Sequence, residues 1–167
     1  MALTEKQQSF LRRIDRISSD KKIHLRKSIG MPLQVGTYPW QAFLSLDPPF
    51  HSEEERQVYY FVACVKASQK EGDKLSVGEC LTKAKRLRGN SDTFENNFLS
   101  LIKSPLDRYG NFEKRLLSLF SKEVMLLIDT EDLLYDLLHW NHGKKFVQEK
   151  WGRALYCPLT EEYTENE

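Results

Sequence analysis

The chain has 167 residues, of which 40% are hydrophobic, and a formal net charge of +1 at pH 7. This length suits one domain or two small bundles. The longest apolar run, residues 58–65, is far shorter than the ~20 residues of a membrane-spanning helix, and residues 1–10 lack the apolar core of a signal peptide. Three widely spaced cysteines, Cys64, Cys80 and Cys157, do not form a disulfide framework. We therefore expect a cytoplasmic protein with reduced thiols.

Short helices separated by glycine and proline are predicted in the N-terminal part of the chain. Apolar residues at helical spacing over residues 10–17 indicate a first amphipathic helix. Asp20 is able to cap a second helix, which Gly30 ends. Pro39 suits the first turn of a short third helix, and the Asp-Pro-Pro sequence at residues 47–49 then breaks the chain.

Two capping boxes are predicted in the middle of the chain. Ser52 with Glu55 opens a helix that runs through Ser68 and is apolar nearly all round, so it belongs in the middle of a bundle. Ser76 with Glu79 opens the next helix.

Four further helices are predicted after residue 90. One starts at Ser91 or Asp92 and stops at residues 104–105, and the next buries an apolar stripe from Phe112 to Phe120. Two more flank the Gly-Lys-Lys turn at residues 143–145. No stretch shows the alternation typical of a strand.

We therefore predict an all-α, compact bundle of about eight to nine helices. Two sub-bundles are expected, at residues 1–90 and 91–157, followed by a frayed acidic tail at residues 158–167.

Catalytic chemistry is not indicated by any motif. The strongest candidate is the set Asp136, His139 and His142, which are spaced three apart. On one continuous helix these side chains spread over about 240°, too wide for one metal ion unless the helix breaks before Gly143. The alternative is that His139 is a surface or lightly buried histidine. We expect no cofactor, no metal and no enzyme activity, and a metal-dependent helical enzyme remains the weaker alternative.

The tryptophans differ in their expected roles. Trp151 falls on an apolar helical stripe and, like Trp140, is expected in the core. Trp40, next to a proline, is left open as a residue that stacks on an unpaired base.

Charge is segregated along the chain despite the neutral total. Basic residues exceed acids by eight to three in residues 1–36, by seven to three in 66–90 and by four to one in 143–153. Such segregation permits a basic face that contacts nucleic acid. The alternative is that these are ordinary solvated helix faces.

An ordered set of motifs covers most of the chain. I-D-x-x-x-L-L-x-D-L-x-x-W begins at Ile128, and V-Q-x-x-W-x-R-x-x-Y ends at Tyr156. Upstream lie Leu-Arg-Lys at residues 25–27, the apolar helix around residues 59–63, S-x-G-x-x-L from Ser76, and Phe98 with the Leu-Ile-Lys that follows at residues 101–103. Together these motifs resemble the CasB family, the small subunit of the type I-E CRISPR Cascade effector.

The resemblance implies a non-catalytic scaffold in antiviral defence. Two copies of such a subunit brace the guide RNA–target DNA assembly, including the displaced strand. The implied partners are the guide RNA and target DNA backbone, the other Cascade subunits and a second copy of the chain, and no membrane. Base pairing between guide and target reads the sequence in such systems, so the subunit stabilises the R-loop through contacts that do not depend on sequence.

The resemblance also suggests nucleic-acid-binding residues. At family positions these are Arg26, Lys27, Lys103, Lys114, Arg115 and Arg153. Asn97 stands where members often carry arginine, and Glu79 where some do, so these two contacts are either missing or supplied by Lys83 and Arg86, which the family pattern does not support.

Two alternatives remain open for these residues. Arg115 could instead form a partly buried salt bridge. The whole chain could instead be a helical adaptor whose charged faces contact only proteins.

Overall fold

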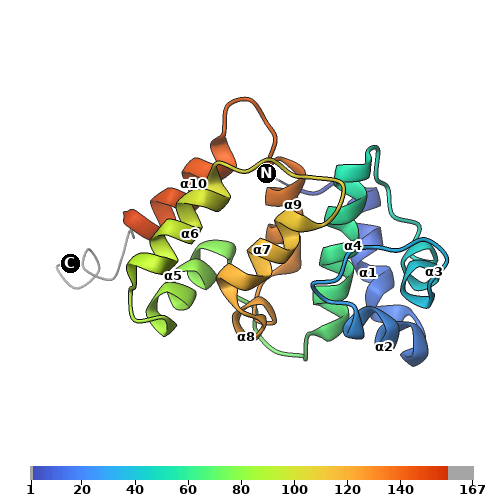
Figure 1. The fold of residues 1–167 in the computed structure, drawn as a ribbon. Helices are drawn as coiled ribbons and strands as arrows, with labels where there is room; N and C mark the ends of the chain where they lie inside the picture. Colours follow the sequence, from blue (N-terminus) through green and yellow to red (C-terminus); the bar gives the residue numbers. More distant parts are fainter. Residues whose placement is uncertain (1, 158–167) are drawn as a thin grey trace.

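The computed structural model describes residues 2–157, and in this range the chain forms ten α-helices (Figure 1). They are α1 (Glu5–Arg16), α2 (Ser19–Lys27), α3 (Tyr38–Leu44), α4 (Glu53–Ser68), α5 (Val77–Leu87), α6 (Asp92–Ile102), α7 (Asn111–Phe120), α8 (Lys122–Met125), α9 (Thr130–Leu138) and α10 (Phe146–Tyr156). The predicted all-α class is confirmed. The described residues contain one isolated β-bridge, between Leu75 and Ile128, and no helix long and apolar enough to cross a membrane. The predicted acidic tail lies outside the described residues.

The helix starts follow the predicted capping residues in part. The capping box of Ser76 and Glu79 is confirmed, because each side chain bonds the other residue's backbone N–H. Ser52 accepts from the Glu55 N–H at 3.1 Å, but the Glu55 carboxylate accepts from the backbone of His51 instead of closing the box.

The predicted cap of α2 is wrong by two residues. Ser18, not Asp20, has the extended backbone of an N-cap, and its hydroxyl accepts from the Lys21 N–H. Asp20 lies inside the first turn, where its negative charge faces the positive end of the helix dipole.

Helix α4 is the centre of one half of the molecule. Ten of its sixteen residues are buried, and they include every position from Gln57 to Val65. Helices α1, α2, α7 and α9 pack against it, and α3 packs against α2 (Figure 1). The prediction that this helix lies in the middle of a bundle is confirmed.

The other half of the molecule forms around α5. This helix packs against α7, α8 and α10, and α6 packs against α7. At Gly78 the backbone of α5 comes so close to α10 that a Cβ atom there would lie 2.9 Å from the Ala154 side chain. Because α5 precedes residue 90 yet packs on helices that follow it, contacts cross the predicted boundary, and the division at that residue stays a prediction.

A buried polar contact fixes α9 against α10. Asp136 is fully buried, and its carboxylate accepts from the Trp151 indole N–H at 2.7 Å and from Lys150 Nζ at 2.5 Å. Burial raises the pKa of Asp136, and these two hydrogen bonds act in the opposite direction. Trp151 and Trp140 are both fully buried, with ring centroids 4.9 Å apart, so their predicted place in the core is confirmed.

Replacing Trp151 with alanine tests this contact. We expect Trp151→Ala to lower the free energy of unfolding by roughly 3–5 kcal/mol, because it empties a large core site and removes a donor from a buried carboxylate. Chemical denaturation measures the change. Tyr109→Ala is the control, because Tyr109 is 67% exposed and should change stability little. A Trp151→Ala variant as stable as the parent would contradict this account of the core.

Glu113 is a second buried carboxylate, but it has no partner. It is 3% exposed on α7, and both carboxylate oxygens lack a hydrogen-bond partner among the described residues. Burial, with a further contribution from the negative charge of Asp107, raises the pKa of Glu113 to about 7. The folded protein therefore holds one more proton than the unfolded chain between pH values near 4.5 and 7, and its stability falls as pH rises through this window.

Replacing Glu113 with glutamine should remove this pH dependence. Relative to the parent, Glu113→Gln should gain on the order of 1–3 kcal/mol of unfolding free energy as pH rises from about 5 to about 8. Denaturation at several pH values measures the gain. Glu123→Gln on α8, an exposed position, makes the same charge change and should show no such trend. If the difference in unfolding free energy between Glu113→Gln and the parent is the same at every pH, the raised pKa of Glu113 is contradicted.

Candidate nucleic-acid interface

The outward face of α7 carries the second predicted basic pair. Lys114 and Arg115 are both exposed. The Arg115 guanidinium donates to the Ser104 hydroxyl at 2.6 Å and to the Ser100 hydroxyl at 2.8 Å, so it links α7 to the C-terminal end of α6. The alternative of a buried salt bridge is wrong, since the partners are hydroxyl groups on the surface. The positive charge of Arg115 is therefore not neutralised by these contacts.

Two more basic residues lie beside this pair. Lys103 is the C-cap of α6, directly before Ser104, and is exposed. Arg88, at the end of α5, donates to the Ser118 carbonyl of α7 at 2.5 Å. Ser118 is one turn after Arg115 on the same helix. We call Arg88, Lys103, Lys114 and Arg115, with the serines that bind the two arginines, the α7 ridge.

Arg88 was not predicted from the sequence. Its neighbour in space is 30 residues away, at Ser118, and no local pattern links the two. Nearby Lys85, in contrast, has a structural role, because it pairs with Glu95 at 3.4 Å and lies 5.6 Å from the centre of the Tyr156 ring.

The first predicted basic pair, Arg26 and Lys27, lies at the end of α2, which packs against α3 and α4. Both residues are exposed, and Arg26 Nε donates to the Ala67 carbonyl near the end of α4. The loop that follows touches α7 at Gly30, which has φ +80° and lies so close to Leu117 that a Cβ atom would be 2.8 Å from that side chain. The loop after the first pair therefore contacts the helix that carries the second pair, although the two pairs are about 90 residues apart in sequence.

The other three predicted residues lie away from these contacts. Arg86 is exposed and Lys83 half-buried on α5, and Arg153 is exposed on α10. Among residues 2–157 no side-chain hydrogen bond or ion pair joins any of the three to the α7 ridge. Of the two departures from the family pattern, Glu79 has a structural role in the capping box of α5, and Asn97 is exposed on α6. A role for these residues in binding stays a prediction.

The alternative metal site is not assembled. Both oxygens of Asp136 are held by Lys150 and Trp151, as described above. His139 follows the end of α9 and its Nδ1 lies 2.7 Å from the Tyr135 carbonyl, while His142 Nδ1 accepts from the backbone of the following loop. Within residues 2–157 no three histidine, cysteine or acidic side chains are grouped so that they could hold a metal ion.

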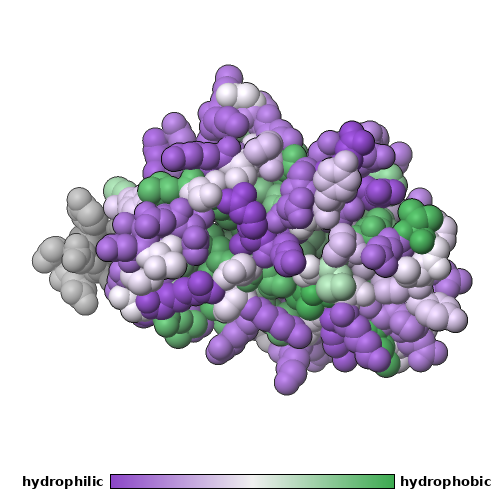
Figure 2. Space-filling view, in the orientation of Figure 1, coloured by the Kyte–Doolittle hydropathy of each residue, from purple (hydrophilic) through white to green (hydrophobic). Residues whose placement is uncertain are grey.

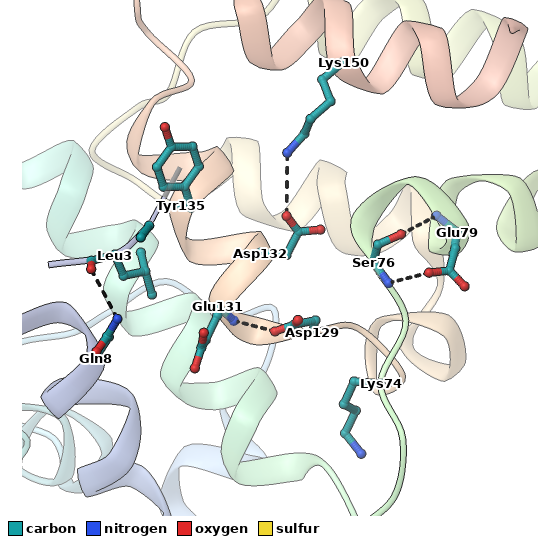
Figure 3. Close-up of a pocket in the computed structure, with 11 residues that line it drawn as sticks. Leu3, Gln8, Lys74, Ser76, Glu79, Asp129, Glu131, Asp132, Tyr135 and Lys150 are labelled. Atoms are coloured by element: carbon teal, nitrogen blue, oxygen red, sulfur yellow. Dashed lines mark hydrogen bonds and ion pairs between the residues drawn. The ribbon is translucent and has the colours of Figure 1, made fainter. Parts of the chain in front are cut away.

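Acidic side chains gather in a different place. A cleft of about 550 Å³ between α1, α5 and α9 is lined by four carboxylates, with Lys74 and Lys150 at its edge (Figure 3). They are Glu79, Asp129, Glu131 and Asp132. Figure 2 shows hydrophilic side chains over most of the face that carries α5, α6 and α7, with apolar surface in the hollow between these helices. The clustering of these four carboxylates agrees with the predicted segregation of charge, and a basic face that contacts nucleic acid stays a prediction.

Comparison with known proteins identifies the family. Residues 23–156 match the family model described as CRISPR-associated protein Cse2. The CRISPR-associated protein Cse2 of Thermus thermophilus is 31% identical over an alignment of 137 residues, which covers 78% of this chain and 75% of the relative.

Solved structures have the same fold. The crystal structure of M. ruber CasB matches with a TM-score of 0.70 and 23% identity, over 99% of this chain and 100% of that chain. A chain of a CRISPR RNA-guided surveillance complex matches with a TM-score of 0.65 and 20% identity, over 97% of each chain. A Cse2-family protein from Thermus thermophilus matches with a TM-score of 0.63 and 25% identity, over 93% of this chain and 99% of that chain. The family model spans most of the sequence, and so the chain belongs to the CRISPR-associated Cse2 family, which confirms the predicted CasB resemblance.

Proposed function

We propose that this chain is a non-catalytic scaffold subunit of a type I-E CRISPR Cascade effector that stabilises the guide RNA–target DNA R-loop. It would do so through contacts to the nucleic-acid backbone that do not depend on sequence. The proposal rests on the surroundings of Arg115. Its exposed guanidinium is positioned by two serine hydroxyls and not by a carboxylate.

The chemistry of the α7 ridge suits phosphate groups. A guanidinium has five N–H donors, so the two bonds to Ser100 and Ser104 leave donors of Arg115 for a phosphate. Lys103 and Lys114 add two exposed ammonium groups on the adjoining surface. Such a surface neutralises phosphates and releases counterions without reading bases.

The proposed partners follow from the family. One structural relative is a chain of a CRISPR RNA-guided surveillance complex, which supports assembly with the other Cascade subunits, guide RNA and target DNA. A second copy of this chain in the same complex remains part of the proposal. Pairing between guide and target supplies the sequence specificity in RNA-guided systems, so a scaffold needs only shape and charge.

Binding to nucleic acid should depend strongly on salt. We expect the purified chain to bind DNA and RNA weakly and without sequence preference, with an affinity that falls by roughly tenfold or more between about 50 and 200 mM salt. Electrophoretic mobility shifts at several salt concentrations measure this. Salt-independent or strongly sequence-selective binding would count against the proposal.

Reversing two charges on the α7 ridge tests the site itself. Lys114→Glu with Arg115→Glu leaves the buried stripe of α7 intact and breaks only exposed hydrogen bonds, so the free energy of unfolding should change by less than about 1 kcal/mol. Two carboxylates would then face the phosphates. We expect normal folding, weaker DNA binding and faster decay of the R-loop in a reconstituted effector.

The matched control reverses Lys70 and Lys74, in the loop between α4 and α5, which changes the net charge by the same amount. This variant should bind DNA with an affinity closer to that of the parent. An equal loss of DNA affinity in both double variants would show that only the total charge of the protein determines binding, which would contradict a site on the α7 ridge. A ridge variant that assembles poorly but binds DNA normally would favour the protein-binding adaptor.

A further inference from the structure

A small aromatic pocket lies at the contact of α2 and α3, apart from the α7 ridge. Its volume is about 500 Å³, and its lining combines one residue of α2 with the start of α3. The lining residues are His24, Gly36, Thr37, Tyr38, Pro39, Trp40 and Gln41.

The aromatic side chains of this pocket are held in place but not covered. The rings of His24 and Tyr38 stack at a centroid distance of 5.0 Å and an interplanar angle of 17°. Tyr38 nevertheless leaves 69% of its surface in water. Its backbone is fixed because Thr37 caps α3 and Pro39 occupies the first turn. Trp40 packs partly against the core. The outer face of Tyr38 is thus a rigid, exposed aromatic surface.

Two lysines flank the pocket residue His24 along α2. Lys21 and Lys27 lie one turn before and one turn after His24 on α2. The lining contains no carboxylate, in contrast to the cleft of Figure 3, which has four. Asp20, the one acid of α2, lies beside Lys21, and none of these three charged residues is among those that line the pocket.

We infer that this pocket binds an unpaired base of single-stranded nucleic acid, which stacks on Tyr38 while Lys21 and Lys27 contact the flanking phosphates. Single-stranded nucleic acids bind in this way, with aromatic platforms for bases beside basic residues for the backbone. The inference rests on the proposed function, because it assumes that the chain contacts nucleic acid. It adds the stacking of a base, a second kind of contact, to the phosphate contacts proposed for the α7 ridge.

A protein partner is the competing occupant. Ile23, Met31, Val35 and Leu44, all in or near α2 and α3, are also exposed apolar residues. The two lysines and the absence of carboxylates from the lining favour a base with its phosphates.

The intrinsic fluorescence of the chain reports on this pocket. Of its three tryptophans, Trp140 and Trp151 are fully buried, whereas Trp40 lines the pocket. We would titrate the full chain with oligothymidylate and with an abasic oligonucleotide of the same length and charge. The base-bearing strand should change the fluorescence and bind roughly fivefold or more tightly than the abasic strand. Trp40→Phe keeps an aromatic ring in the pocket and should abolish the fluorescence change.

Substitution of Tyr38 is the decisive step. Tyr38→Ala should reduce the affinity for oligothymidylate to that for the abasic strand, with an unchanged melting temperature. Tyr109→Ala removes an equally exposed tyrosine, 67% against 69%, from the loop before α7, and should keep the preference for bases.

The outcomes separate this inference from the proposed function. If both strands bind equally, with a salt dependence that Tyr38→Ala does not alter, the stacking site is refuted while backbone binding stands. If Tyr38→Ala impairs only assembly with other subunits, the pocket is a protein-docking site and the inference is wrong. If neither strand binds at any salt concentration, both proposals fail.

Discussion

The rest of the structure depends on the burial of α4, whose side chains are apolar on almost every side of the helix. Every residue from Gln57 to Val65 is buried, and full burial of one large apolar side chain contributes roughly 1.5–3 kcal/mol. A helix of this kind is stable only when other helices surround it, and α1, α2, α7 and α9 do so. Because α7 uses one side to cover the core, its opposite side must face solvent, and this is the side on which Lys114 and Arg115 lie. The exposed ridge is therefore a consequence of the core.

The contact between α9 and α10 adds specificity to this packing. A carboxylate as deeply buried as Asp136 is costly unless it is paired, and it accepts from both Lys150 and Trp151. These donors are adjacent residues on α10, so only one register of the two helices satisfies the carboxylate. Glu113 on α7 shows the contrast, since its oxygens have no such donors and its pKa rises to about 7.

Local rules predicted most of the helices, and contacts between distant residues explain what they missed. Apolar spacing predicted α4, and the box of Ser76 and Glu79 predicted the start of α5, because both depend on residues within a few positions of each other. The role of Asp136 could not be found in this way. Its spacing to two histidines suggested a metal site, whereas its partners lie 14 and 15 residues further along the chain. The same holds for Arg88 with Ser118 and for the stacked rings of His24 and Tyr38.

Helix dipoles offer a physical reason why charge is segregated in a chain that is nearly neutral. Nine of the ten helices in residues 2–157 carry an acid in the first turn, and Arg26, Lys27, Arg86 and Arg153 all lie in last turns. Each such placement stabilises a helix by about 0.3–1 kcal/mol, so these basic residues have a structural reason to be where they are. Lys114 is the fourth residue of α7, outside the last turn, so the dipole offers it no such stabilisation, and it is exposed with no ion pair among the described residues. Lys83, inside α5, likewise has no ion pair among the described residues, so the dipole argument accounts for neither of these two charges.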